Sequence, residues 1–366
     1  MNSKKNILFF IGANYVSGAE ITNLNLLRDL QSKGYHILVI VSGWNDGDFI
    51  DRLKKLGIKY KVVKLGFIYR SKWKWTIDSL MHLPIAWLEI YKVIKKFKPD
   101  WIYHASYRSF IMAYPLIRSY RNIYREHNNP DVSRSNLKIY NFLNRHIKLF
   151  LCNSSSVKET LAKVGISSKK IHAIGSPIDP EILNKKTDSA LNHPIHIGII
   201  GQIIKEKGFD FVFDELTKVN GEYKLFIYGN DNTEYAKNLR VNIPTNLTKV
   251  VHWMGYESDR KKIYDNLDVI LYPSYSEGFG RVAMEAASNG IPTVASNLPC
   301  FLEVIKHEVS GKIFDLKTKK NLVKDLEDLI NEPSKIKILG TEARTIALNN
   351  FSSEMCTNRF IDLIYE

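Results

Sequence analysis

Cysteine is scarce in this sequence. The 366 residues include only Cys152, Cys300 and Cys356, which lie far apart and form no CxxC pair. A disulfide framework and a structural zinc site both need paired or closely spaced cysteines, so we expect neither. The pattern favours a protein of a reducing compartment, and we expect the cytoplasm.

The sequence also lacks an apolar run long enough to cross a bilayer. The segment LMHLPIAWLEIYKVI, from Leu80, contains His82, Pro84 and Glu89 and falls short of the roughly 20 residues that a span needs. The opening MNSKKNILFFIGA superficially resembles a secretion signal, but its short apolar run leads into a glycine loop and an amphipathic helix. We interpret it as a buried first strand.

Acidic residues are under-represented in the first half of the chain. Residues 1–190 carry 31 Lys+Arg and 14 Asp+Glu, a net +17, whereas residues 191–366 carry 21 and 24, a net −3. The first half is therefore expected to meet something anionic, such as a phosphate-bearing substrate or an acidic membrane surface. Nucleic acid is not an expected partner, because no nucleic-acid motif and no compact basic run occur.

Short apolar runs recur along the chain, separated by longer amphipathic stretches. They include NILFFIG, HILVIVS and DWIYHAS in the first half and HIGIIG, YKLFIYG, KVVHWMG and VILYPS in the second. This alternation predicts parallel sheets with helices on both faces. The proline-containing, aperiodic residues 174–194 are the expected linker between two such domains. Ligands of these sheets bind beyond the carboxyl ends of the strands.

Two carboxylates flank a glycine turn in EGFGRVAMEAASNG. Glu277 is expected in the loop after a strand, and Glu285 in the helix that follows. The amides of Gly278, Phe279 and Gly280 would open that helix and suit a phosphate. A carboxylate deeper in the site suits two sugar hydroxyls, because it accepts two hydrogen bonds. The alternative is that Glu285 is a half-exposed helix residue and Glu277 a helix cap.

Two further glycine turns follow expected strands. In HIGIIGQIIKEKG, Gly201 precedes Lys205 and Lys207, and a lysine there would neutralise a pyrophosphate, unless it is simply solvated. Gly18, in GANYVSGAE, would let the backbone approach a phosphate. That first turn lacks the GxGxxG spacing, which disfavours a dinucleotide.

Together these segments resemble the retaining glycosyltransferases of family 4, which have the GT-B fold. Six segments match the family in their order along most of the chain. They are SGAE, CNSSSVKETL, IHAIGSPID, GQIIKEKG, HWMGY...IYDNLDVILYPS and the E-x7-E signature. The resemblance implies an α/β protein of two doubly wound, Rossmann-like domains facing a central cleft. Residues 1–188 would bind the acceptor, residues 189–348 the nucleotide sugar, and the helix at 349–366 would pack back on the first domain.

The resemblance also implies roles for the glycine-turn residues. Glu285 would hold the ribose hydroxyls and Glu277 would lie at the donor sugar. The amides of Gly278 to Gly280 would meet the sugar and the diphosphate, with Lys207 on the diphosphate and Gly18 approaching it from the other domain.

The nucleotide base and the donor sugar have expected neighbours as well. The base would rest near Gly229 and the WMGY loop that ends at Tyr256. His127, in IYREHNNP, is the best match to a histidine that lines the donor sugar in the family, and His104 is its rival. A lone histidine is also often structural.

One position departs from the family pattern. Gln202 stands where many members have an arginine on the diphosphate, so binding would lean on Lys207 and the helix amides. We hypothesise that Arg281, beside the phosphate turn, compensates. A DxD triplet in NDGD, at Asp46 and Asp48, would bind a metal in another glycosyltransferase fold, but here it falls in a polar turn, and we expect no metal and no cofactor.

The expected reaction transfers a sugar from a nucleoside-diphosphate sugar, UDP- or GDP-linked, to a hydroxyl of a saccharide or lipid-linked acceptor, as in surface polysaccharide or glycoconjugate synthesis. A GT-B nucleotide-sugar epimerase and an inactive, glycosyltransferase-like partner subunit are the alternatives. In the first half, Lys72, Trp73, Lys74 and Trp75 mix cations with aromatics, which favours peripheral contact with an anionic membrane. The alternative is an ordinary helical hairpin with a solvated basic face.

Overall fold

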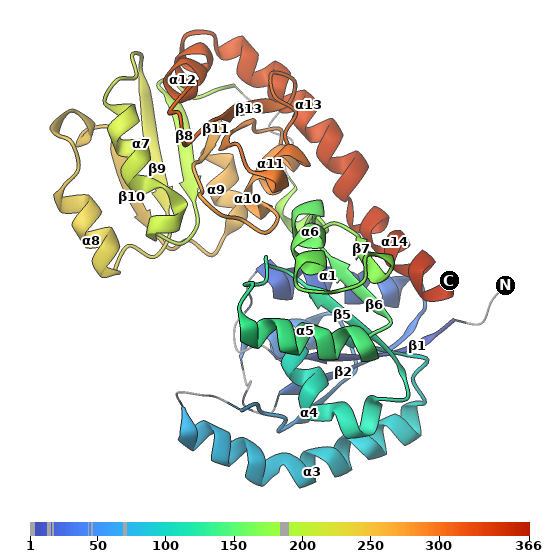
Figure 1. The fold of residues 1–366 in the computed structure, drawn as a ribbon. Helices are drawn as coiled ribbons and strands as arrows, with labels where there is room; N and C mark the ends of the chain where they lie inside the picture. The colour runs from blue at the N-terminus through green and yellow to red at the C-terminus, as the bar shows by residue number, and fades with distance from the viewer. Residues whose placement is uncertain are drawn as a thin grey trace. The chain divides into compact units, whose positions relative to one another are not determined.

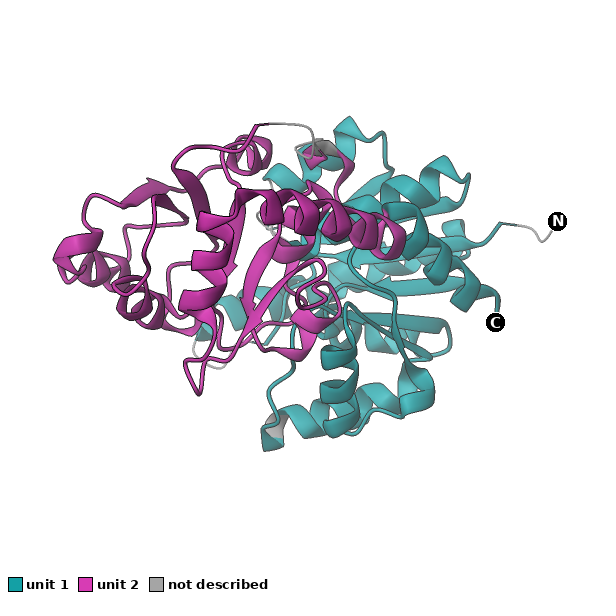
Figure 2. Cartoon of the chain, turned by 90° about the horizontal axis from the view of Figure 1, so that it is seen from above, with its two compact units in different colours: residues 1–177, 353–366 teal, residues 178–352 magenta. Residues whose placement is uncertain are grey.

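The computed structural model describes residues 4–12, 16, 18–42, 44, 47–68, 72–183 and 190–366. The chain divides into two compact units, residues 1–177 with 353–366 and residues 178–352 (Figure 2). The second unit thus starts before the expected boundary at 188/189, because Ile178 and Ile182 pack into its core. It also continues past residue 348, because Phe351 is buried in the same core.

The first unit contains a seven-stranded parallel sheet (Figure 1). Its strands are β1 (Asn6–Ile11), β2 (His36–Ser42), β3 (Tyr60–Val63), β4 (Trp101–His104), β5 (Arg121–Glu126), β6 (Leu149–Cys152) and β7 (Ile171–Ala173). They lie in the order β3-β2-β1-β4-β5-β6-β7, so the winding direction reverses between β1 and β4. That reversal opens a crevice at the carboxyl ends of these two strands, where such sheets bind ligands.

Strand β1 shows why helices cover both faces of this sheet. Ile7, Phe9 and Ile11 belong to one hydrophobic core and Leu8 and Phe10 to another, because successive side chains point to opposite faces. The first core is closed by helices α1 (Gly18–Ser32), α2 (Asp48–Lys55) and α14 (Ser353–Tyr365). The second is closed by α3 (Trp73–Phe97), α4 (Tyr107–Ile117), α5 (Arg134–His146) and α6 (Ser155–Lys163).

The second unit contains a six-stranded parallel sheet. Its strands are β8 (Ile195–Ile200), β9 (Tyr223–Tyr228), β10 (Val251–Gly255), β11 (Val269–Tyr272), β12 (Thr293–Ser296) and β13 (Gly311–Phe314). The order β10-β9-β8-β11-β12-β13 reverses between β8 and β11, as the first sheet does between β1 and β4.

Two hydrophobic cores also lie on the faces of the second sheet. The helices of this unit are α7 (Phe209–Leu216), α8 (Glu234–Val241), α9 (Arg260–Asp265), α10 (Arg281–Ser288), α11 (Pro299–Leu302), α12 (Leu322–Asn331) and α13 (Pro333–Phe351). One core collects apolar residues of α7, α8 and α12, and the other collects those of α9, α10 and α11. The predicted α/β architecture of two doubly wound, Rossmann-like domains is confirmed.

The C-terminal helix α14 returns to the first unit, as predicted. Phe360 and Ile364 are buried in the core shared with α1, and the indole of Trp101 donates to the Ile364 carbonyl at 3.1 Å. At the start of α14, the Asp29 carboxylate of α1 accepts hydrogen bonds from Ser353 and Thr357. Apolar and polar contacts together fix the end of the chain.

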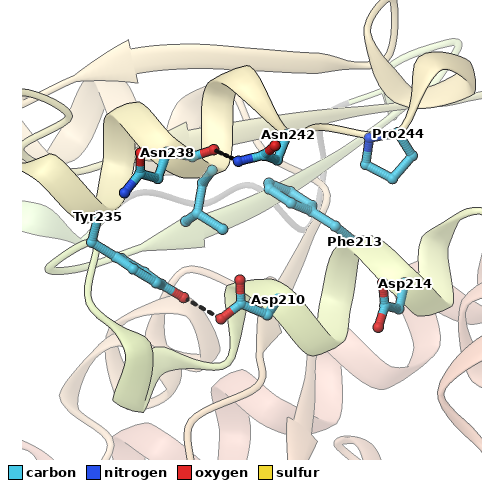
Figure 3. A pocket seen from close by; sticks show the side chains of 8 residues that line it. Asp210, Phe213, Asp214, Tyr235, Asn238, Asn242 and Pro244 are labelled. Carbon is cyan, nitrogen blue, oxygen red and sulfur yellow. Dashed lines mark hydrogen bonds between the residues drawn. The ribbon is translucent and has the colours of Figure 1, made fainter.

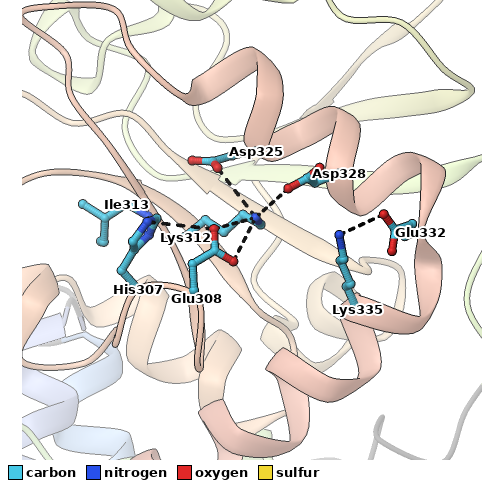
Figure 4. A network of polar contacts seen from close by, with 8 residues as sticks. All are labelled: His307, Glu308, Lys312, Ile313, Asp325, Asp328, Glu332 and Lys335. Carbon is cyan, nitrogen blue, oxygen red and sulfur yellow. Dashed lines mark hydrogen bonds and ion pairs between the residues drawn. The ribbon is translucent and has the colours of Figure 1, made fainter.

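The edge strands β7 and β13 and the helix α13 were not predicted. Strand β13 carries Lys312, whose side chain is 1% exposed and whose ammonium donates to Glu308 at 3.0 Å and Asp328 at 3.1 Å (Figure 4). Asp325 Oδ1 lies 3.6 Å from the same ammonium nitrogen. A buried lysine interrupts the apolar pattern of a strand and obscures it in the sequence.

No helix in the described ranges is both long and apolar enough for a membrane span. Helix α3 is the longest of the described helices, with 25 residues, and it is one continuous helix rather than a hairpin.

Candidate active site

The predicted donor-site residues of the second unit follow adjacent strands of its sheet. Gly201 and Gln202 follow β8, Gly229 follows β9, and Glu277 lies in the loop after β11. Strands β8 and β11 flank the reversal of strand order. The carboxyl edge of the sheet at that reversal is therefore the candidate site.

Glu277 and Lys207 meet at this edge. The Lys207 ammonium donates to Glu277 Oε1, and the same oxygen accepts the Tyr272 hydroxyl at 2.6 Å. The ammonium also lies 5.4 Å from the centre of the Tyr272 ring. The side chains of Lys207 and Glu277 are only 19% and 17% exposed, so their attraction is weakly screened. Burial, reinforced by the Glu277 charge, raises the pKa of Tyr272 well above its usual value and keeps it a donor.

The glycine turn between the two glutamates leads directly into α10. Gly280 precedes the helix with φ of 77°, and a Cβ on it would lie 2.5 Å from the Phe301 ring. Only glycine fits that backbone and that space. Helix α10 begins at Arg281, close to the predicted start, so its first amides face the turn formed by Gly278 to Gly280.

Glu285 is fully buried. Its carboxylate pairs with Arg281 Nε at 2.9 Å and with the guanidinium of Arg260, and it accepts the Tyr264 hydroxyl at 2.7 Å. The interpretation of Glu285 as a half-exposed helix residue is therefore wrong. In this state the carboxylate already has three partners, so a ribose would have to replace at least one of them.

Arg281 faces Glu285 in this structure. Its side chain is 16% exposed, and the pair is spaced i, i+4 along α10. Arg260 begins α9 and is 25% exposed. Two guanidiniums around one carboxylate leave an excess positive charge beside the glycine turn. This charge would attract an anionic ligand.

The remaining donor-site candidates lie around the β8 and β9 ends. A Cβ on Gly229 would lie 2.1 Å from the Gly201 carbonyl oxygen, so the loops after β8 and β9 touch there only because Gly229 has no side chain. Gly201, Gln202, Lys207 and Tyr272 line one small crevice. Tyr256, just after β10, is 80% exposed.

In the first unit, His127 lines a cavity of about 350 Å³ at the ends of β4 and β5. Its Nδ1 lies 3.3 Å from the Asn153 amide nitrogen. Ala19 of α1, next to Gly18, lines the same cavity, so both predicted elements of this unit come to one place. His104 is different, because it is completely buried between Ser109 and Asn122, and burial lowers its pKa to about 3.

Glu126 is the acidic residue in the lining of this cavity. One carboxylate oxygen accepts the hydroxyls of Tyr124, at 2.6 Å, and Tyr140, and the other accepts the His127 amide at 3.2 Å. Burial raises the pKa of Glu126, and the two tyrosine hydrogen bonds oppose that rise. Tyr107, Arg108, Asn128 and Asn136 add aromatic and polar groups to the lining.

A second cavity, of about 180 Å³, lies between α7 and α8 (Figure 3). The Tyr235 hydroxyl donates to Asp210 across it at 2.8 Å. None of its lining residues comes from the glycine turns.

No cluster of three metal-binding side chains occurs in the part of the chain that the structure describes. Asp46 of the DxD triplet lies outside that part, and Asp48 begins α2 and pairs with Arg52.

Several residues around the predicted site were missed. Tyr272 ends a buried strand, and a polar-tipped residue at the carboxyl end of a strand is a usable signal. Glu126 could have been noticed for the same reason. Arg260 and Tyr264 lie on a different helix from Glu285, and no sequence spacing connects them with it.

Comparison with known proteins adds to this geometry. The model described as Glycosyltransferase Family 4 matches residues 16–182, and the model described as Glycosyl transferases group 1 matches residues 182–346. The two matches adjoin and follow the two-domain GT-B order. With the fold, they show that the chain belongs to the GT-B glycosyltransferases.

Individual relatives agree with that class. The Staphylococcus aureus capsular polysaccharide biosynthesis glycosyltransferase CapM is 26% identical over 181 residues, which are 49% of this chain and 48% of CapM. The chain thus spans about half the length of this relative. An uncharacterized glycosyltransferase of Haemophilus influenzae is 22% identical over 90% of this chain and 91% of its own. Anabaena HepE, solved with UDP and glucose, has a similar fold, with a TM-score of 0.79, 19% identity and 99% of each chain covered.

Proposed function

We propose that the chain transfers a sugar from a nucleoside-diphosphate sugar to an acceptor hydroxyl and retains the anomeric configuration. The observation that carries the proposal is the pairing of Lys207 with Glu277 beside the Gly278–Gly280 turn, at the reversal of the second sheet. UDP- and GDP-sugars are the proposed donors, and HepE, of similar fold, was solved with UDP and glucose.

The proposed chemistry is mainly electrostatic. Negative charge grows on the diphosphate as the glycosidic bond loosens, so fixed cations and amides lower the barrier. Lys207 would supply the cation, and the amides at the start of α10 would supply donors. The carboxylate of Glu277 would orient Lys207 and lie at the donor sugar, and Glu285 would accept the ribose hydroxyls once a partner gives way. The leaving phosphate oxygen would take the acceptor proton.

We propose that the acceptor binds in the cavity around Glu126 and that His127, in the same lining, also contacts the donor sugar. The cavity's mixture of tyrosines, a carboxylate, an arginine and amides suits a saccharide, whose hydroxyls need hydrogen-bonding partners and whose apolar ring face packs on aromatics. We propose a surface polysaccharide or glycoconjugate as the product, in line with the capsular role that the name of CapM states. The same proposal includes metal-independent catalysis and action in the cytoplasm, at the inner face of the membrane.

A two-stage experiment tests the proposal. Thermal shifts with UDP, GDP, ADP and dTDP first identify the nucleotide, because a ligand stabilises by RT ln(1 + [L]/Kd). The matching nucleotide sugars are then incubated with and without saccharide acceptors, and products are separated by anomer. Release of free nucleotide with an α- or β-product of unchanged anomeric configuration is expected. A sugar isomer formed without acceptor would instead mean an epimerase, and the absence of any nucleotide binding would overturn the proposal.

Lys207→Met tests the role proposed for Lys207 in the transfer. It should keep the fold, because the side chain lies at the sheet edge, and should abolish most of the transfer. Lys205→Met, two residues earlier in the same turn, is the control and should retain it.

A further inference from the structure

Helix α3 has a second apolar face that nothing in the described chain covers. This face, which we call the outer face of α3, consists of Trp73, Ile77, Met81, Ile85, Leu88 and Tyr91, each between 47% and 71% exposed. At 100° per residue these positions fall within one arc of about 120°. Along the helix they extend over roughly 27 Å at 1.5 Å per residue.

The outer face is not the face that holds α3 to its unit. Ser79, Ala86, Ile90 and Ile94 are buried on the opposite side, and the last three belong to the core shared with α4 and α5. A surface helix needs only one apolar stripe to pack. A second, solvent-facing stripe of this size marks an interaction surface.

Positive charge is concentrated at the two ends of the outer face, beside Trp73 and after Tyr91. Helix α3 and its two flanking residues carry Lys72, Lys74, Lys92, Lys95, Lys96 and Lys98. None of these six forms an ion pair with another described residue. A partner that fits this surface is therefore apolar along the middle of the helix and anionic at its two ends.

The two acidic residues of α3 do not offset these lysines. Asp78 accepts the Trp44 indole at 3.0 Å and pairs with His82, and Glu89 pairs with Lys61 at 3.3 Å. Both carboxylates are thus used within the unit.

We propose that α3 lies in the plane of an anionic bilayer, with its outer face among the acyl chains and its lysines at the lipid phosphates. Amphipathic helices bind this way when a broad apolar face is bounded by cations, and tryptophan is common at that depth. A second copy of the chain fits less well, because a two-fold pair of outer faces would bring the same lysines together. The inference deepens the membrane location included in the proposed function by naming the surface and the lipid chemistry, and it does not depend on the sugar transfer itself.

Sedimentation with vesicles tests the proposal on the full chain. Vesicles of phosphatidylcholine with 30% phosphatidylglycerol are compared with pure phosphatidylcholine, at low and at moderate salt. The wild type should bind the anionic vesicles and be only partly released by salt, because insertion adds to the electrostatic attraction. Failure to bind the anionic vesicles at low salt overturns the proposal.

Two variants separate insertion from adsorption. Ile85→Asp/Leu88→Asp should lower the partition coefficient at least tenfold, because both side chains lie in the outer face. Ile338→Asp is the matched control, since Ile338 is 64% exposed on α13 and Ile85 is 62% exposed. It should bind like the wild type, and thermal unfolding should show that all variants remain folded.

Three further results would overturn the inference. Unchanged binding of Ile85→Asp/Leu88→Asp would exclude the outer face. If Lys92→Glu/Lys96→Glu lost vesicle binding while Ile85→Asp/Leu88→Asp kept it, the chain would adsorb by charge without insertion. A dimer in light scattering that Ile85→Asp dissociates would assign the outer face to a second copy.

Discussion

Glu285→Ala is expected to destabilise the second unit, besides any effect on nucleotide binding. The wild-type carboxylate is fully buried and is the acidic partner of both Arg260 and Arg281, and Tyr264 donates to it as well. Removal of one member of a buried ion pair costs about 3–5 kcal/mol, because the remaining charge stays desolvated. The arginines are 25% and 16% exposed and can recruit some water, so we expect about 3 kcal/mol.

Thermal unfolding without ligand measures this effect. In a domain of this size about 1 kcal/mol shifts Tm by roughly 2–4 °C, so Glu285→Ala should lower Tm by about 6–12 °C. Glu277→Ala is the matched control. Glu277 and its partner Lys207 are both partly exposed, and the lysine that remains can be hydrated, so the loss should be nearer 1 kcal/mol.

The ranking of the two variants decides whether this reasoning holds. Equal Tm values for Glu285→Ala and Glu277→Ala would refute the claim that Glu285 neutralises two half-buried arginines. A further variant tests the mechanism, because replacing an ion pair with apolar residues of similar volume removes the stranded charge. Glu285→Met/Arg281→Met should therefore recover part of the stability that Glu285→Ala loses.

Three other predictions concern the two units separately. Glu277→Gln should lower kcat for transfer by roughly 10² with little change in Tm, because it leaves Lys207 without its counter-charge beside the reacting sugar; steady-state kinetics checks this. Glu126→Gln should raise the acceptor KM about tenfold and leave nucleotide affinity unchanged, and an equal loss of both would contradict an acceptor site there. Burial raises the pKa of Asp325 to about 6 from 3.8, so the folded state holds this proton more tightly than the unfolded state. The stability that this group contributes is thus present at low pH and is lost as pH rises through about 6. Denaturant titrations of the wild type and of Asp325→Asn check this. Relative to the variant, the free energy of unfolding of the wild type should fall by up to about 1.4 kcal/mol per pH unit between pH 4 and 6.

The fold could be predicted because its signals are local. Continuous apolar strands such as β1 and β11 are buried on both faces of parallel sheets, and glycines mark the turns at their carboxyl ends. The edge strand β7 was missed because it has only three residues, and β13 was missed because Lys312 interrupts its apolar pattern. The unit boundaries moved for a related reason, since burial of Ile178 and Phe351 depends on distant residues of the core.

The two doubly wound domains, and the glycine turns with Glu277, Lys207 and Glu285 next to them, could be predicted because strand, turn and helix signals lie within a few residues of one another. Three features depend instead on long-range packing: Lys207 bonds to Glu277, Arg260 reaches Glu285 from another helix, and α3 packs on one apolar face and exposes the other. Periodicity shows that a helix has an apolar stripe, but which stripe is covered depends on the elements that the chain folds against it.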